Sequence, residues 1–390
     1  MSEIVCEGLD GSNPLHALAA FGLLRLGNRL SRGGSVQLAW RMADGAWRAV
    51  LHVEQAPEQL LSEIAQSLVV LGSVGNVDAQ LSRAVRELNA DVKRVDGRIK
   101  EGVKRARADA KARGLDKAAM AQHVEASVAA LREELLAKQR QRADAQVELA
   151  AANGGGIAHL GEMISVAPEI LRAAAAPAFA RLLHPTDSDL PLTTSDPELV
   201  LAQLPALACD QLHEGGKLTP TPLSFSNGSS GQCLLKDFRA CASAVTLERL
   251  AAALAGSRKA CVEGYTGLNW DPGEQVSYAL VWADPATAGK APPVAMNALA
   301  YVGLSLVPCV PMGSRLVAVG WGPHKSFTWP LWETPLPLDA TMSLLAHAEL
   351  VQPEPDMASL RTRGVVALQR AQVVNPTGKR NFFAPSRPVA

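Results

Sequence analysis

The sequence predicts an α+β protein: a mixed globular body with an inserted long antiparallel coiled-coil helical hairpin. Polar and apolar residues alternate as in strands in both terminal parts of the chain, apolar residues recur at heptad spacing in the middle, and the composition changes sharply where that middle part begins. We expect an N-terminal α/β part of the body at residues 1–76, the hairpin at 77–152, and a C-terminal α+β part with a basic tail at 153–390.

The N-terminal part is expected to begin with a strand, EIVCEGL, followed by a turn and an apolar helix. Ser12 or Asn13 can cap this helix, and Pro14 fits its first position. Gly22 lies within the apolar face, where the missing side chain permits close approach of a neighbour. VQLAWRM and AWRAVLHV flank an Asp-Gly turn, which predicts a β-hairpin.

Between about Asp78 and Ala150 aromatic residues and prolines vanish and charged residues become dense. Apolar residues alternate spacings of four and three there, which is the seam of a coiled coil. They are Leu81, Val85, Leu88, Val92, Val95 and Ile99 in one arm, and Met120, Val124, Val128, Leu131 and Leu135 in the other. Gly114 ends the first helix and Asp116 caps the second. Each arm is about 50 Å long at about 1.5 Å per residue, so we expect the pair to project from the body.

The hairpin holds 16 Lys and Arg against 12 Asp and Glu, a net charge of +4. One interpretation is a solvated coiled-coil surface in which ion pairs consume many of these charges. The other is an arm that contacts nucleic acid through its densest cations. These cations are Arg94, Arg98, Lys100, Lys104, Arg105, Arg107, Lys111 and Arg113.

The composition argues against several classes of function. Lys and Arg number 38 and Asp and Glu also number 38, so bulk charge does not hold this chain on DNA, although local basic patches can exist. The sequence has no GxxxxGKS or GxxxxGKT loop, no HExxH motif and no CxxC pair among its six cysteines. It has no signal peptide and no apolar run long enough to cross a bilayer. We therefore expect a cytoplasmic, non-enzymatic protein without a metal or cofactor.

The tail from Met357 to Ala390 is the clearest electrostatic feature, with six cations and no Asp or Glu, a net charge of +6. Its cations are Arg361, Arg363, Arg370, Lys379, Arg380 and Arg387. They interleave with the strand-like segment VVALQRAQVV, a pattern typical of contact with a nucleic-acid backbone. The alternative is a solvated chain end that is basic by chance.

Three further features have a structural and a functional interpretation. The Ser/Gly loop with Ser229, Ser230 and Gln232, followed by a helix with Lys236, is either an ordinary turn or a phosphate site. Asn297 is either a core amide or a reader of a base edge. The aromatic cluster favours a core over base stacking, because it alternates with prolines and strands. Its members are Trp270, Tyr278, Trp282, Trp321, Phe327, Trp329 and Trp332.

The order of LNWDPGEQ, YALVWADP, MNALAYVGL, FTWPLW and SLLA resembles the large-subunit family of type I-G (formerly I-U) CRISPR-Cas surveillance complexes. The opening LDGSNPLHALAAFGLLRL and the closing RTRGVVALQR and NFFAP are similar to that family's ends, so the resemblance covers roughly half of the chain. It implies a subunit of the RNA-guided complex that binds beside the crRNA-bound backbone and handle-binding subunits. Such a subunit recognises the flanking motif (PAM) of target double-stranded DNA, helps to open the duplex and recruits the helicase-nuclease.

On this hypothesis the protein contributes to antiviral defence as a non-catalytic, DNA-binding subunit. The candidate nucleic-acid contacts are Ser229, Ser230, Gln232, Lys236, Asn297, Lys325, Arg361, Arg363, Arg370, Lys379 and Arg380. The alternative from a different class is a structural adaptor, whose coiled-coil hairpin binds a protein partner while the body never touches nucleic acid.

Overall fold

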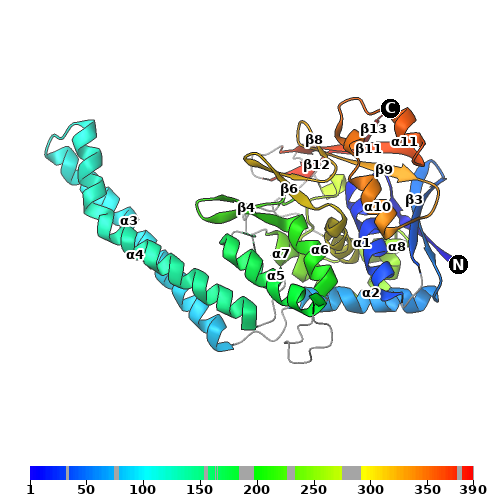
Figure 1. The fold of residues 1–390 in the computed structure, drawn as a ribbon, viewed down its shortest axis with the longest axis horizontal. Helices are drawn as coiled ribbons and strands as arrows, with labels where there is room; N and C mark the ends of the chain where they lie inside the picture. The colour runs from blue at the N-terminus through cyan, green and yellow to red at the C-terminus, as the bar shows by residue number, and fades with distance from the viewer. Residues whose placement is uncertain are drawn as a thin grey trace.

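The computed structural model describes residues 1–31, 35–73, 79–152, 157–162, 164, 166–183, 197–225, 233–274, 291–375 and 380–389. These residues form a body of mixed helices and sheets, from which one long helical pair projects (Figure 1). The predicted α+β class with a long helical hairpin is therefore confirmed.

The helices of the body run over both parts of the chain that flank the hairpin. They are α1 (Pro14–Leu30), α2 (Pro57–Gly72), α5 (Pro168–Leu183), α6 (Pro197–Leu207), α7 (Leu234–Ser243), α8 (Leu247–Leu254), α9 (Val294–Gly303), α10 (Leu338–Leu345) and α11 (Met357–Arg361). Short 3-10 helices are η1 (Ile157–Leu160), η3 (Arg258–Ala260), η4 (Pro272–Glu274), η6 (Leu304–Leu306) and η7 (Ala348–Val351). None of the described helices is both long and apolar enough to cross a membrane.

A four-stranded antiparallel sheet joins the parts of the chain before and after the helical hairpin, in the order β1-β3-β2-β10. Its strands are β1 (Ser2–Asp10), β2 (Gln37–Ala43), β3 (Ala46–Val53) and β10 (Leu336–Pro337). β2 and β3 form the predicted hairpin, and both turn residues, Asp44 and Gly45, have positive φ angles. β10 comes from the C-terminal part and pairs Leu336 with Leu38 of β2. The N-terminal and C-terminal parts thus share one sheet.

A second sheet has the order β12-β11-β9-β8, with β13 also paired to β11. Its strands are β8 (Trp321–Gly322), β9 (Ser326–Trp332), β11 (Val365–Val374), β12 (Phe382–Phe383) and β13 (Arg387–Val389). β11 is the predicted strand VVALQRAQVV, so the basic tail is part of the folded sheet. Two hairpins stand beside these sheets: β4 (Ala208–Glu214) with β5 (Lys217–Pro220), and β6 (Cys309–Met312) with β7 (Arg315–Ala318).

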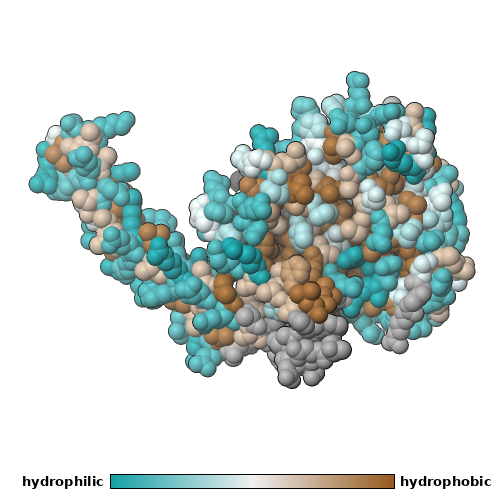
Figure 2. Space-filling view, viewed as in Figure 1, coloured by the Kyte–Doolittle hydropathy of each residue, from teal (hydrophilic) through white to brown (hydrophobic). Residues whose placement is uncertain are grey.

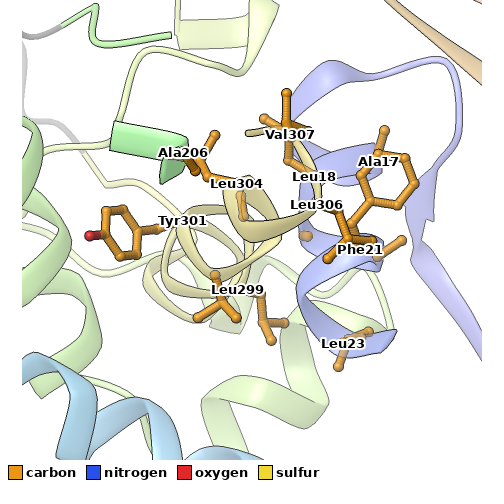
Figure 3. Packing of buried hydrophobic residues seen from close by; sticks show 14 of the residues in the cluster. Ala17, Leu18, Phe21, Leu23, Ala206, Leu299, Tyr301, Leu304, Leu306 and Val307 are labelled. Carbon is orange, nitrogen blue, oxygen red and sulfur yellow. The ribbon is translucent and has the colours of Figure 1, made fainter. Parts of the chain in front are cut away.

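The centre of the body is the crossing of α1 and α9, whose side chains interlock in the main apolar core (Figure 3). A Cβ added to Gly22 would lie 1.9 Å from the carbonyl oxygen of Leu299. A Cβ added to Gly303 would lie 1.9 Å from the carbonyl oxygen of Leu18. The two helix backbones therefore touch, which confirms the predicted close approach at Gly22 and identifies Gly303 as its partner.

Indole rings of β9 connect this core to the first sheet. The Nε1–H of Trp329 donates to the carbonyl oxygen of Gly11 at 2.8 Å, and that of Trp332 donates to Leu38 at 2.7 Å. The Trp332 ring also stacks on Phe21 of α1, with 6.4 Å between ring centroids. Both of these indole N–H groups thus have an acceptor, so the two rings add apolar area to the core without leaving their donors unsatisfied.

Most of the predicted aromatic core is confirmed. Trp270, Phe327, Trp329 and Trp332 are fully buried, and Trp321 is half-buried. Tyr278 and Trp282 lie outside the described residues. The rings with described positions therefore hold the fold together, and only Trp321 keeps part of its ring in contact with solvent.

The projecting arm consists of α3 (Ala79–Ala112) and α4 (Lys117–Ala152), with a mostly hydrophilic surface (Figure 2). The predicted helix end and cap are confirmed: Gly114 has φ +66°, and the Asp116 carboxylate accepts the Ala119 N–H at 2.8 Å. Ala150, near the end of α4, is fully buried, and Val147 packs against the main core of the body. The arm is therefore anchored to the body through the last turns of α4.

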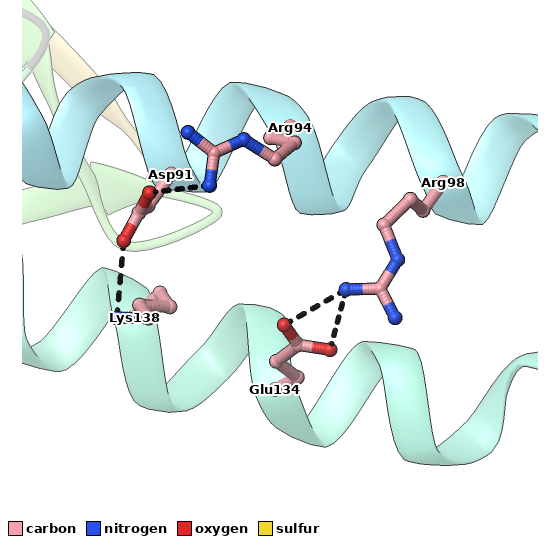
Figure 4. Close-up of polar contacts among 5 residues, drawn as sticks. All are labelled: Asp91, Arg94, Arg98, Glu134 and Lys138. Atoms are coloured by element: carbon pink, nitrogen blue, oxygen red, sulfur yellow. Dashed lines mark hydrogen bonds and ion pairs between the residues drawn. The ribbon is translucent and has the colours of Figure 1, made fainter.

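Ion pairs cross between the two helices of the arm (Figure 4). Arg98 of α3 pairs with Glu134 of α4 at 3.0 Å. Asp91 pairs with Arg94 on its own helix at 3.0 Å and with Lys138 on the other at 3.1 Å. Such exposed pairs contribute roughly 0.2 to 1 kcal/mol each, so they support the register of the hairpin more than its stability.

We predict that Gly22→Ala destabilises the body by about 3 kcal/mol or more, because the new methyl group would overlap the backbone of α9. The matched control is Gly97→Ala in α3, where nothing lies within 4 Å of the added Cβ. All seven tryptophans lie outside the hairpin, so urea unfolding followed by their fluorescence reports on the body alone. A Gly22→Ala midpoint equal to that of Gly97→Ala would contradict the backbone contact.

Candidate nucleic-acid interface

A groove of about 1200 Å³ opens on the side of the body where four distant segments meet. Its walls are the β6–β7 hairpin, the turn between β8 and β9, the segment around η7, and the end of β5. Val373 of β11 and Asn381 complete the lining. The volume exceeds the range of about 300 to 1000 Å³ that is usual for small-molecule pockets, which suits an elongated ligand.

The ionisable side chains that line this groove are all basic. They are Arg315, His324, Lys325 and His347, and no Asp or Glu is among the described lining residues. Arg315 and Lys325 are exposed, so their charges face the solvent in the groove, and the His324 side chain is exposed as well. A concave surface lined by one sign of charge raises the local concentration of ligands of the opposite sign. The lining of the groove therefore favours an anionic ligand.

Apolar groups lie beside these cations in the same groove. Val310 and Met312 of β6 are exposed and line it, and so does the half-buried ring of Trp321. Sites for single-stranded nucleic acid combine basic residues that follow the backbone with aromatic and apolar surface for the bases. The lining of this groove fits that combination better than it fits a simple inorganic anion.

Lys325 lies at a tight turn that the protein holds in place. His324 and Lys325 have φ angles of +58° and +53°, in the left-handed region that side chains other than Gly rarely adopt. The Lys325 carbonyl oxygen accepts the Val373 N–H at 2.9 Å, and the Ser326 hydroxyl donates to the Pro323 carbonyl at 2.8 Å. The backbone that carries Lys325 is thus fixed to β11, which presents its ammonium group at the edge of the groove.

Arg370 is not among the residues that line the groove, and its contacts give it a structural role. Its Nε–H donates to the Thr328 hydroxyl at 2.9 Å, and its terminal amino groups donate to the carbonyl oxygens of Leu350, Gln352 and Pro353 at 3.3, 2.6 and 3.3 Å. Desolvation lowers the pKa of this guanidinium from its usual value. Arg370 therefore attaches the η7 segment to the sheet. The sequence predicts a contact with nucleic acid at this residue, whereas its guanidinium group binds backbone carbonyl oxygens of the protein itself.

The other described cations among those predicted in the tail are not residues that line the groove. Arg361 ends α11 and is exposed, and Arg363 donates to the carbonyl and hydroxyl oxygens of Ser359 at 2.9 Å each. Arg380 is half-buried and directly precedes Asn381, which lines the groove. Lys379 lies outside the described residues. Of the predicted contact residues, Lys325 is the one that the structure places in the groove.

The remaining predicted contacts are dispersed. Lys236 is exposed in the first turn of α7. Asn297 is fully buried: its Oδ1 accepts the Leu268 N–H at 2.9 Å and its Nδ2 donates to the Pro293 carbonyl at 3.2 Å. It is thus a core amide that joins α9 to the segment before Trp270, and it does not reach a base. Ser229, Ser230 and Gln232 lie outside the described residues.

Sequence reasoning missed Arg315, His324, His347 and Asn381. Arg315 begins the strand-like segment RLVAVGW, and a basic residue at the start of a strand carries no functional signal on its own. The two histidines are 23 positions apart in the sequence and belong to no motif. Their shared location depends on the packing of the η7 segment beside the turn between β8 and β9.

The described residues offer little for covalent or metal chemistry. No three or more of their His, Cys, Asp and Glu side chains group as metal ligands. All six cysteines are free, and four of them are buried. Burial raises the pKa of the Cys6 and Cys241 thiols to about 12, which leaves them protonated and unreactive at neutral pH.

Comparison of the chain with protein-family models, with curated proteins and with solved structures gives no match.

We predict that Arg370→Leu lowers the free energy of unfolding by about 2 kcal/mol, because the carbonyl oxygens of Leu350, Gln352 and Pro353 and the buried Thr328 hydroxyl lose their charged donor. Amide hydrogen exchange at residues 348–352 should accelerate at the same time. The control is Arg361→Leu at the end of α11, an exposed arginine whose loss should change stability by less than about 0.5 kcal/mol. Equal rates of amide hydrogen exchange at residues 348–352 in the two variants would contradict the structural role of Arg370.

Proposed function

We propose that this protein is a non-catalytic subunit of a type I-G-like CRISPR interference complex, and that its groove binds a nucleic-acid strand. The CRISPR assignment rests on the ordered sequence patterns from LNWDPGEQ to FTWPLW and on the similar chain ends. In such a complex the guide RNA reads the target by base pairing, and protein subunits bind the flanking motif and the backbone. The expected partners are the crRNA-bound backbone and handle-binding subunits, target double-stranded DNA, and the helicase-nuclease recruited after target binding.

The observation that carries the nucleic-acid part of this proposal is the lining of the groove. The whole chain has equal numbers of basic and acidic residues, yet the ionisable residues of the groove are all basic. Exposed Val310 and Met312 add apolar surface that a phosphate ion would not need. A strand with a charged backbone and flat apolar bases matches both features.

A second candidate function is a structural adaptor, which the projecting arm favours. α3 and α4 extend from the body and are joined by ion pairs across their interface, so a partner protein could bind them without contact to the groove. The adaptor hypothesis predicts that the groove is irrelevant to assembly. Variants of the groove and variants of the arm therefore distinguish the two functions: the first should affect nucleic-acid binding, and the second should affect assembly with a partner protein.

We predict that Arg315→Gln combined with Lys325→Gln weakens binding of a 20-nucleotide single strand about tenfold at low salt. Each lost phosphate contact should reduce the slope of log affinity against log salt concentration by about 0.7, so the pair should reduce it by about 1.4. Fluorescence anisotropy at several salt concentrations measures both quantities.

The matched control for this experiment is Arg258→Gln combined with Lys259→Gln, on η3. These two residues are also an exposed Arg and Lys, and neither lines the groove. Both variants lose the same charge, so a general electrostatic effect would appear in each. If the control loses as much affinity as the groove variant, the groove is not the binding site.

We predict that the tagged protein, produced with its genomic neighbours, copurifies with CRISPR subunits and a repeat-derived RNA. Sequencing of the bound RNA identifies the guide, and duplex binding with and without a flanking motif tests target recognition. Removal of residues 81–149 in the same preparation tests the adaptor function: loss of assembly with retained DNA binding would favour it. Recovery of the protein alone and free of RNA would overturn the CRISPR assignment.

A further inference from the structure

We infer that the outer end of the arm, defined as residues 100–124, is a separate binding surface for a nucleic-acid backbone. This inference concerns a surface remote from the groove and stands without it. It depends on where the arm carries its charge, on which cations lack acidic partners, and on the type of surface that surrounds them.

The excess positive charge of the arm is concentrated at this outer end. Residues 100–124 contain seven Lys and Arg against three Asp and Glu, a net charge of +4. The inner part, residues 79–99 and 125–152, contains nine Lys and Arg against eight Asp and Glu, a net charge of +1. The inner part is therefore close to neutral, as expected for a coiled coil that only needs to stay solvated.

The few acidic groups of the outer end are already engaged. Glu101 pairs with Arg105 at 3.5 Å, and Asp109 pairs with Arg113 at 3.4 Å and contacts His123 at 3.0 Å. The third, the helix-capping aspartate at the start of α4, accepts a backbone N–H. None of these carboxylates forms an ion pair with Lys104, Arg107 or Lys111.

Four exposed cations of the outer end have no ion-pair partner within the described part of the chain. They are Lys104, Arg107, Lys111 and Lys117. Eight cations of the arm are predicted as a possible nucleic-acid contact, and three of them, Lys104, Arg107 and Lys111, belong to this unpaired group. The other five, Arg94, Arg98, Lys100, Arg105 and Arg113, each pair with a carboxylate.

Three of these cations form a row along α3. Lys104, Arg107 and Lys111 follow at intervals of three and four residues, so they lie on one face of the helix. At about 1.5 Å per residue the row spans roughly 10 Å. Phosphates along one strand of duplex DNA rise about 3.4 Å each, so the row matches about three of them.

The surroundings of the row favour nucleic acid over a protein partner. Ala106 and Ala110, which alternate with these cations along α3, are small and buried. The one large apolar side chain that is exposed among the described residues of the arm, Leu136, lies in the inner part. Stable protein interfaces are enriched in aromatic residues, Met and Arg and depleted in Lys. A Lys-rich surface without exposed large apolar groups instead fits a phosphate backbone.

The test compares two triple variants of the full-length protein that carry the same net charge. The outer variant combines Lys104→Gln, Arg107→Gln and Lys111→Gln. The control combines Arg83→Gln, Arg86→Gln and Lys93→Gln in the inner part of α3, where the three residues are also exposed and lack ion-pair partners among the described residues. Far-UV circular dichroism checks that both variants keep the helical content of the arm.

The probes are a 30-base-pair DNA duplex of random sequence and a 30-nucleotide RNA, each titrated from low to moderate salt. The outer variant should lose about tenfold or more in affinity at low salt for at least one probe, and its salt slope should fall by about 2 to 3. The control should change affinity less than twofold. Equal losses in the two variants, or no loss in the outer variant, would overturn the inference.

A photocrosslinking residue provides a measurement that general electrostatics cannot mimic. Ala108 is exposed next to the cationic row, and Ala90 is equally exposed in the inner part. Crosslinks to the probe should form from position 108 and not from position 90, and they should persist when Arg315 and Lys325 of the groove are changed to Gln. If the groove does not bind nucleic acid, the crosslink from position 108 should still form. If neither position crosslinks to the probe, or if both crosslink equally, the outer end of the arm is not a separate binding surface.

Discussion

The contact between the backbones of α1 and α9 is the constraint on which the body depends. Helix axes normally lie 8 to 10 Å apart because side chains separate them, and a closer crossing requires residues without a Cβ at the point of contact. Gly22 and Gly303 supply this on both helices. α1 follows directly from β1, and α9 packs on α7 and α8, so the crossing connects the first sheet to the helices of the C-terminal part. Two segments separated by about 280 residues are thereby held in one core.

The groove depends on this core through β9. Trp329 and Trp332 lie in β9, and their indole N–H groups attach it to Gly11 and Leu38 of the N-terminal part. The turn that carries Lys325 directly precedes β9, and Arg370 of β11 ties the η7 segment to the same strand through Thr328. Lys325 and His347 therefore stand beside or on segments that these hydrogen bonds hold in place, which limits the entropy lost when a ligand binds.

The sequence was sufficient for the parts of the structure that local pattern determines. Heptad spacing from Leu81 to Ile99 identified the arm, the Asp-Gly turn identified the β2–β3 hairpin, and Gly22 was recognised as a point of close approach. The groove was not predictable, because its basic residues come from separate segments that only tertiary packing brings together. Tertiary packing also explains why the prediction for Arg370 fails. Its position in a basic tail indicates phosphate binding, while the structure surrounds its guanidinium group with backbone carbonyl oxygens.

Electrical neutrality of the whole chain explains why location matters more than total charge in this protein. A neutral protein gains little from long-range attraction to nucleic acid, since opposing charges cancel beyond a Debye length of about 8 Å at physiological salt. Binding then requires places where exposed cations outnumber the nearby acidic groups. The groove and the outer end of the arm both meet that condition, and the nearly neutral inner part of the arm lies between the body and the outer end. A ligand that touched both surfaces would bind more tightly than either surface alone allows, because the second contact becomes intramolecular once the first has formed.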